Sequence, residues 1–196
     1  MKTYTLPCVE SIDWSKAEVQ QIQQCRWSPN AAPAATVQGL YLKNKALVFR
    51  LESLALPSRK LNTAPDSSVW EDSCLECFIS FDGEKYMNIE CNANGAFLCC
   101  IGPDRNERAY VRKLGIALPQ VCAREQDGGW EATVSIPLDC IEALWACRPD
   151  SGMNFSANFY SCGDKTPLPH YAAWNEVKTE NPDFHRPEFF GKIIIE

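Results

Sequence analysis

The segment from Ser68 to Ala96 most constrains the fold, because it alternates apolar and polar residues on both sides of a tight turn. The odd-numbered residues of 75–81 and of 87–91 are all apolar, and most of the even-numbered residues between 74 and 92 are polar. Alternation of this kind is typical of strands with one buried face, and Asp82-Gly83 is a turn sequence. We therefore predict a β-hairpin that forms one wall of a ligand cleft.

The register of this hairpin decides which polar residues become neighbours. Glu76 faces either Asn88 or Glu90, depending on how the loop around Gly83 is placed. In both registers Glu76 shares one face of the sheet with Asn88, Glu90 and Asn92. Such a polar face also occurs on sheets that simply face solvent and bind no ligand.

The rest of the chain predicts further strands and one helix. Strands are expected at 36–43, 46–53, 96–101, 115–124, 130–136, 153–160 and 192–196. A short helix is expected at 137–146, where Pro137 and Asp139 precede an apolar side. Residues 1–35 are expected to be irregular and 161–190 to form a long loop. These elements indicate an antiparallel β-sandwich, and residues 1–196 fit a single domain.

Charge and hydropathy narrow the classes of partner. The formal net charge is −6, and the acidic residues are scattered along the chain. A nucleic-acid or anionic-membrane partner calls for a basic face, so neither is expected. The N-terminus lacks the apolar stretch of a signal peptide, and no apolar run approaches the roughly 18 residues of a membrane span. We therefore expect a cytoplasmic protein, unless an export signal has been removed.

Eleven cysteines suggest metal or disulfide chemistry at first sight. Their odd number excludes complete pairing within the chain. Cys74 and Cys77 form a C-x-x-C motif, but alternation on a strand directs their side chains to opposite faces. They cannot share a metal there, and the two histidines, His170 and His185, lie far away in sequence. Small reduced thiols, mostly buried, are the expected state, with no metal site and no cofactor.

Two tryptophans, Trp70 and Trp174, stand in polar segments outside the alternating strands. Each could cap the core or offer a flat surface to a ligand. A sugar ring suits two aromatic surfaces with a polar rim, since apolar walls supply burial and polar groups fix orientation. The candidate rim consists of Glu76, Asn88, Glu90, Asn92 and Asn158.

A resemblance to a known family supports this interpretation. The sequence WEDSCLECFI at 70–79 resembles the W-E-x-D-x-x-E-x-F stretch of family-nine carbohydrate-binding modules and their DOMON-like relatives, with Asp72 one place early. YMNIECNANG at 86–95 is similar to the family's second strand and N-x-N-G turn. NFY at 158–160, Trp174 and FHRPEFFG at 184–191 resemble the terminal signature of its cytosolic-type members. The similarity runs from about Trp27 to the end.

The resemblance implies a jelly-roll-like or immunoglobulin-like sandwich and a specific site. In the family, two tryptophans clamp a terminal sugar and a glutamate six residues after the first one hydrogen-bonds its hydroxyls, which matches Trp70, Glu76 and, as second clamp, Trp174. The family's site arginine has no counterpart between Asn88 and Asn92. The family often holds structural calcium, to which Asp66, Glu71 and Asp72 could contribute, although we assign no metal.

Three functions remain open at this stage. The first is non-catalytic binding of a mono- or oligosaccharide. The second is a DOMON-like interaction or small-molecule module without sugar specificity. The third is a glycoside-active enzyme, because Glu76 and Glu90, if directly opposed, could approach the ~5 Å carboxyl separation of retaining glycosidases.

Overall fold

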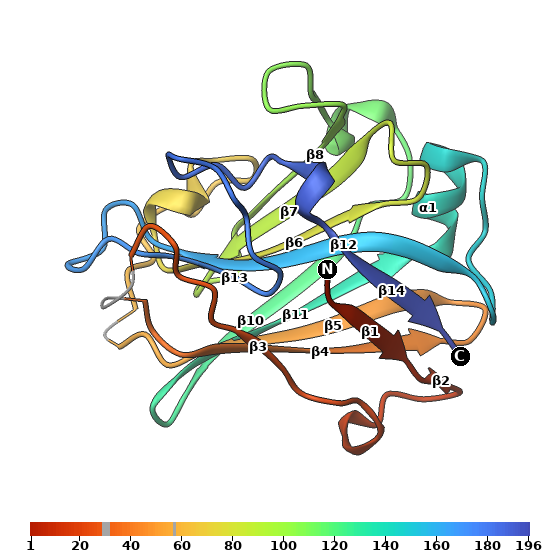
Figure 1. The fold of residues 1–196 in the computed structure, drawn as a ribbon, viewed down its shortest axis with the longest axis horizontal. Helices are drawn as coiled ribbons and strands as arrows, with labels where there is room; N and C mark the ends of the chain where they lie inside the picture. Colours follow the sequence, from red (N-terminus) through yellow and green to blue (C-terminus); the bar gives the residue numbers. More distant parts are fainter. Residues whose placement is uncertain (29–31, 57) are drawn as a thin grey trace.

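The computed structural model describes residues 1–28, 32–56 and 58–196, and it consists of two β-sheets packed face to face (Figure 1). The eight-stranded sheet has the order β1-β14-β12-β6-β7-β8-β9, with β13 also paired to β12. The six-stranded sheet has the order β10-β11-β5-β4-β2, with β3 also paired to β4. The predicted β-sandwich is therefore confirmed.

The eight-stranded sheet comprises β1 (Thr3–Leu6), β6 (Cys74–Ser80), β7 (Tyr86–Asn92), β8 (Phe97–Gly102), β9 (Ala109–Tyr110), β12 (Asn154–Cys162), β13 (Tyr171–Ala173) and β14 (Gly191–Ile195). The six-stranded sheet comprises β2 (Cys8–Val9), β3 (Gln20–Ile22), β4 (Ala35–Leu42), β5 (Ala46–Ser53), β10 (Gln120–Gln126) and β11 (Gly129–Pro137). Helix α1 spans Leu138–Trp145, as expected from Pro137. Among the described residues, four short 3-10 turns complete the elements: η1 (Trp14–Lys16), η2 (Val69–Glu71), η3 (Val111–Leu114) and η4 (Pro187–Phe189).

The central hairpin, β6 and β7, forms as the alternation predicted. Its register places Glu76 directly opposite Glu90, and on its other side Glu76 faces Tyr160 of β12. Gly83 takes a left-handed backbone with φ 75° in the connecting loop, where residues other than glycine are disfavoured. The choice left open by the sequence is thus resolved in favour of Glu90.

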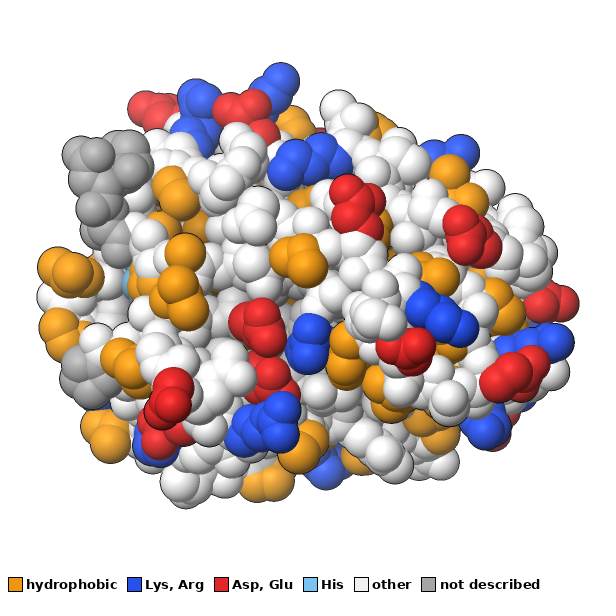
Figure 2. All heavy atoms as spheres, turned by 90° about the horizontal axis from the view of Figure 1, so that it is seen from below, with side chains coloured by type: hydrophobic (Ala, Val, Ile, Leu, Met, Phe, Trp, Pro, Cys, Tyr) orange, Lys and Arg blue, Asp and Glu red, His pale blue; other side chains and the backbone are white. Residues whose placement is uncertain are grey.

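The hairpin of β4 and β5 shows why one face of the six-stranded sheet is exposed to solvent. Leu47, Phe49 and Leu51 point into the core between the sheets, while Arg50 and Glu52 alternate with them. Arg50 pairs with Glu52 at 3.8 Å on the outer side. Figure 2 shows that face with acidic and basic side chains interspersed rather than gathered by sign.

The N-terminal segment is more ordered than the sequence indicated. Residues 1–35 contain β1, β2, η1 and β3, and the first two strands pair in parallel with β14 and β4 respectively. Pro7 stands between them, so the chain passes from one sheet to the other there (Figure 1). Strands of two to four residues carry too little alternation to be recognised, because distant partners determine them.

The C-terminal segment covers the outer face of the eight-stranded sheet. Phe184 stacks on Tyr160, with ring centroids 4.1 Å apart, and Phe190 packs edge-on against Phe78. These residues belong to a second apolar cluster, separate from the core between the sheets. The polar face of β6 and β7 is consequently buried, and it is not a solvent-facing sheet.

Trp174 is a core residue, which corrects its predicted role as a ligand clamp. Its side chain is 0% exposed, packs against Tyr4 and Phe159, and donates from Nε1 to Gln20 Oε1 at 3.1 Å. A Cβ at position 191 would clash with the indole ring, so Gly191 permits this packing. The backbone continues this placement: β13 ends at Ala173, and the N–H of Trp174 still donates to the carbonyl of Phe159 in β12.

Most of the cysteines are buried, as expected. All eleven lie within the described residues and are free, and seven of them are buried. Cys74 packs in the outer apolar cluster and Cys77 in the core between the sheets. The two thiols of the C-x-x-C motif therefore do lie on opposite faces. Within the described part of the chain, no helix has the length and apolar character needed to cross a membrane.

Replacing the two tryptophans by alanine is expected to affect stability very differently. Trp174→Ala should lower the free energy of unfolding by about 3–5 kcal/mol, because it empties a fully enclosed site. Trp70→Ala should cost about 1 kcal/mol or less, because that ring is 37% exposed. Urea denaturation followed by circular dichroism measures both values. Equal losses for the two variants would contradict the assignment of Trp174 to the core.

Candidate functional site

A cavity of about 280 Å³ opens through the cover of the eight-stranded sheet. We call it the outer-face pocket, and it is lined by Trp70, Glu76, Glu90, Arg105, Arg108, Cys162, Asp164, Tyr171, Pro182, Asp183, Phe184 and His185. Strands β6, β7 and β12 supply Glu76, Glu90 and Cys162, and loops supply most of the rest. The pocket combines aromatic, acidic and basic groups, and its volume is near the lower end of ligand sites.

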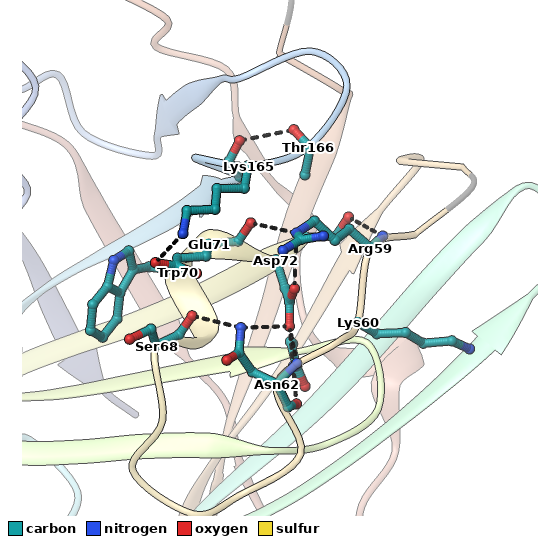
Figure 3. Close-up of polar contacts among 12 residues, drawn as sticks. Arg59, Lys60, Asn62, Ser68, Trp70, Glu71, Asp72, Lys165 and Thr166 are labelled. Atoms are coloured by element: carbon teal, nitrogen blue, oxygen red, sulfur yellow. Dashed lines mark hydrogen bonds and ion pairs between the residues drawn. The ribbon is translucent and has the colours of Figure 1, made fainter.

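Trp70 lies on the short turn η2, which holds the indole in the pocket. The carbonyl of Trp70 accepts the backbone N–H of Asp164 at 3.1 Å, and the next carbonyl, of Glu71, accepts from Arg59 Nε and from the N–H of Lys165. Figure 3 shows the indole of Trp70 on one side of the turn and the carboxylate of Asp72 on another. The turn is thus tied to two separate loops, and this fixes the position of Trp70.

Asp72 is the buried anchor of this arrangement. Its Oδ2 accepts hydrogen bonds from the backbone and side-chain nitrogens of Asn62 and from Asn92 Nδ2, at 2.8–3.2 Å. Its Oδ1 lies 3.2 Å from Arg59 Nε. Burial alone would raise the pKa of Asp72, but these hydrogen bonds outweigh it and lower the pKa. Asp72 therefore stays ionised and holds the 59–62 segment, η2 and β7 together (Figure 3).

Glu76 and Glu90 face one another at the base of the pocket, and both are buried. Burial, reinforced by the nearby charge of Glu90, raises the pKa of Glu76 well above its usual range. Burial likewise raises the pKa of Glu90 to about 7, although Arg108 and the hydrogen bond from Asn88 oppose that rise. Two opposed carboxylates cannot both ionise cheaply in such a site. The pair is accordingly an acceptor site that retains a proton near neutral pH.

Arginines from the loop between β8 and β9 reach over this acidic pair. Arg108 Nη1 lies 3.9 Å from Glu90 Oε1, beyond hydrogen-bond distance, and has no hydrogen-bond partner among the described residues. Arg105 Nη2 lies 3.4 Å from Asp183 Oδ1, which joins that loop to the C-terminal cover. The pocket thus offers a buried donor next to buried acceptors, a pairing that suits ligand hydroxyl groups.

Three further rings line the pocket besides Trp70, those of Tyr171, Phe184 and His185. Tyr171 begins β13 and is partly exposed, and Phe184 packs edge-on against it with centroids 6.2 Å apart. His185 Nδ1 lies 2.8 Å from the hydroxyl of Tyr86. Burial and the two arginines, Arg108 and Arg105, lower the pKa of His185 to about 3, so its imidazole is neutral at physiological pH.

Three of the seven residues predicted for the site, Trp70, Glu76 and Glu90, line the pocket. The others have structural positions: besides Trp174, these are Asn88, Asn92 and Asn158, all fully buried. Asn88 Nδ2 donates to Glu90 Oε1 at 2.8 Å, Asn92 bonds to Asp72, and Asn158 holds Asn175 through two hydrogen bonds. The rim amides thus brace carboxylates and loops, because the C-terminal cover encloses the face they share.

Several pocket residues were not identified from the sequence. Arg105 and Arg108 lie in a charged loop without alternation, and Tyr171 precedes Trp174 by three residues. Asp183 directly precedes the terminal signature at 184–191, and Phe184 and His185 are its first two residues. The only available signal was the clustering of charge after β8 and of aromatic residues after Cys162.

The three carboxylates considered for calcium do not fit that ion. Asp72 is paired with Arg59, Asp66 Oδ2 lies 3.2 Å from Arg112 Nε, and Glu71 Oε1 lies 2.9 Å from Lys165 Nζ. A calcium site needs six to eight oxygen ligands converging on one point. Each of these carboxylates instead faces its own cation, as Figure 3 shows for Asp72 and Glu71.

The architecture defines a β-sandwich binding module, with one sheet covered by loops and a small polar and aromatic pocket through the cover. Comparison with family models places residues 7–195 in the group described as Carbohydrate-binding family 9. The chain belongs to this family. No curated protein was found to match it.

Solved structures share the fold. A candidate carbohydrate-binding protein from Bacteroides uniformis is similar over 100% of this chain and 99% of its own, with TM-score 0.80 and 24% identity. A family 9 module from Caldicellulosiruptor kristjanssonii in complex with cellotriose has a TM-score of 0.67 and 13% sequence identity, and the match covers 100% of this chain and 94% of that module. A family 9 module from the same organism in complex with glucose has a TM-score of 0.70 and 14% sequence identity, and the match covers 100% of this chain and 96% of that module.

Replacing Glu90 by glutamine is expected to flatten the pH dependence of stability. A carboxyl group whose pKa is raised to about 7 on folding stabilises the protein fully below its unfolded pKa, near 4.5, and loses that stabilisation as pH rises through 7. Between pH 5 and pH 8 the wild type should lose on the order of 2 kcal/mol more than Glu90→Gln.

Urea unfolding at several pH values measures this difference. Glu188→Gln is a suitable control, because burial does not dominate the pKa of Glu188: its ion pair with Arg186 lowers that pKa. Parallel pH profiles for the wild type and Glu90→Gln would contradict the raised pKa of the buried pair.

Proposed function

We propose that this protein binds carbohydrate, without catalysis, in the outer-face pocket. Membership of Carbohydrate-binding family 9 supports this function, as do the cellotriose and glucose complexes of the Caldicellulosiruptor kristjanssonii modules. The single observation that carries the proposal is the combination of an exposed indole with buried acceptors and a free donor in one cavity.

The proposed contacts follow from the chemistry of a pyranose. Trp70 presents a partly exposed ring, and the apolar C–H face of the sugar would be buried against it. Glu76 and Glu90 accept hydrogen bonds from hydroxyl groups, and Arg108 Nη1, without a hydrogen-bond partner in the described chain, donates one. A ligand oxygen at that position would remove the cost of a buried unsatisfied donor.

Tyr171 replaces Trp174 as the second aromatic residue of the proposed site. Both Tyr171 and Trp70 line the pocket, whereas Trp174 is enclosed in the core. The backbones that carry them are linked through the segment after β12, since Asp164 N–H bonds to the carbonyl of Trp70. This pairing keeps a two-ring site while assigning the second ring to a residue that a ligand can touch.

The pocket favours a short ligand or the end of a chain. Its volume of about 280 Å³ lies just below the usual 300–1,000 Å³ range of ligand sites. The Arg105–Asp183 pair joins the loop after β8 to the C-terminal cover at the pocket. We therefore assign a mono- or disaccharide unit as the bound portion.

A glycoside-active enzyme is the competing function, and the direct opposition of Glu76 and Glu90 is the observation in its favour. Retaining glycosidases pair one protonated acid with one ionised nucleophile. Here burial raises the pKa of both carboxyl groups: Glu76 keeps its proton, and Glu90, with a pKa of about 7, is only partly ionised at neutral pH, whereas a nucleophile must carry its charge. Binding is therefore the function that this electrostatic arrangement supports better.

Alanine replacement of the two pocket rings tests the binding proposal. Isothermal titration calorimetry with glucose, cellobiose and cellotriose should show affinity weakened at least tenfold, about 1.4 kcal/mol, in Trp70→Ala and in Tyr171→Ala. Trp14→Ala is the matched control, because Trp14 packs beside Arg50 on the other sheet. Unchanged affinity in both pocket variants would refute the site.

Incubation with the same sugars separates binding from catalysis. We expect sugar binding by the wild type without release of new reducing ends over a long incubation. Release that disappears in Glu76→Gln would instead establish the enzyme. Absence of binding to any sugar, with both rings intact, would favour an interaction module that shares only the fold.

A further inference from the structure

A second group of side chains borders the outer-face pocket and shares only Glu76 with the proposed sugar contacts. Cys74 and Glu76 lie two residues apart on β6, and their side chains therefore share a face. Cys162 of β12 stands directly opposite Cys74 in the strand register. The two Sγ atoms and a carboxylate oxygen of Glu76 all lie within 4.8 Å of one another.

The contacts of this group are internal and buried. Cys162 Sγ donates a hydrogen bond to Glu76 Oε1 at 3.0 Å. All three residues are at most 3% exposed, yet Glu76 and Cys162 line the pocket. The group is thus enclosed by protein on most sides and reachable from the pocket on one.

From this geometry we propose that Cys74, Glu76 and Cys162 form a binding site for a thiophilic divalent cation such as Zn²⁺. Two thiolates and one carboxylate are a ligand set that zinc accepts, with Zn–S near 2.3 Å and Zn–O near 2.0–2.2 Å. Tetrahedral ligand atoms around such an ion are about 3.5–3.8 Å apart by these bond lengths. The observed spacing reaches that geometry with side-chain shifts of about 1 Å or less.

Three protein ligands leave the fourth position of a tetrahedral ion open. Because Glu76 and Cys162 line the pocket, that position faces it, and water or a ligand hydroxyl would complete the coordination. Binding displaces the two thiol protons and the carboxyl proton of Glu76 to solvent, since thiolate and carboxylate are the metal ligands. Structural zinc sites are closed by four protein ligands, whereas this one keeps an open position.

The charge distribution also suits a cation at this place. Two carboxyl groups and two thiols gather here, from Glu76, Glu90, Cys74 and Cys162. Within ion-pair distance, the described residues provide Glu76 with no lysine, arginine or histidine, while Arg108 approaches Glu90 instead. A divalent ion would supply the missing positive charge between groups that otherwise repel one another.

Cobalt titration of the reduced protein tests this site without reference to sugar binding. Co²⁺ bound by thiolates in a tetrahedral site produces visible d–d and near-ultraviolet charge-transfer bands, which Zn²⁺ then abolishes by displacement. We expect one Co²⁺ per chain, release of the two thiol protons and of the Glu76 proton on binding, and affinity reduced at least tenfold in Cys74→Ser, Cys162→Ser and Glu76→Gln.

The controls separate this site from the other thiols of the chain. Cys100→Ser changes a buried thiol of the same apolar cluster, and a double variant with Cys8→Ser and Cys122→Ser removes two exposed thiols. Both should keep the wild-type bands. Circular dichroism melting checks that each variant is folded, and Zn²⁺ should raise the Tm of the wild type but not of folded Cys162→Ser.

Three outcomes would overturn the proposal. The first is the absence of thiolate bands in the reduced wild-type protein. The second is bands that persist in Cys162→Ser and vanish when Cys8 and Cys122 are replaced. The third is a Cys74–Cys162 disulfide in the purified protein, seen as a mass loss of two hydrogens, together with no metal uptake after reduction. Failure of sugar binding would leave these results unaffected, because the metal is read by its own absorption.

Discussion

The opposition of Glu76 and Glu90 beneath the C-terminal cover is the constraint on which the site depends. A hairpin register places the two carboxyl groups face to face, and the cover removes them from water. Each therefore resists ionisation, and the surrounding residues reflect that: Asn88 donates to Glu90, Cys162 donates to Glu76, and Arg108 approaches from the loop after β8. The pocket opens through the cover above this group of buried polar atoms.

The remainder of the site is built from segments that have no regular structure of their own. Trp70 is held in place because Asp72, ionised and buried, ties its turn to the 59–62 segment and to β7. The cover is held by rings stacked on the sheet, chiefly Phe184 on Tyr160, and by Asn158 bonding to Asn175. Taken alone, the alternation in the sequence predicts that this strand face is exposed to solvent. In the structure it is instead covered by a second, outer apolar cluster that contains the pocket.

Prediction from sequence succeeded where a signal is local. Alternation identified the hairpins of β4–β5 and β6–β7, and proline identified α1, because burial of one face imposes a period along a single element. It also identified Trp70, Glu76 and Glu90 as pocket residues. It missed β1, β2 and Arg108, because β1 is positioned by β14, β2 by β4 and Arg108 by its approach to Glu90, all far away in the chain. It misplaced Trp174 for the same reason, since that ring packs against the distant Tyr4 and Phe159.

The amino-acid sequence by itself determined the β-sandwich, the hairpin that carries the acidic residues, and the separation of Cys74 from Cys77 on opposite faces. Those features follow from side-chain alternation along one strand. Only the tertiary structure decided that Glu76 faces Glu90, that Cys162 joins Cys74, and that Tyr171 rather than Trp174 borders the pocket. The reason is that register across strands and the path of a covering loop depend on long-range packing, which no local period encodes.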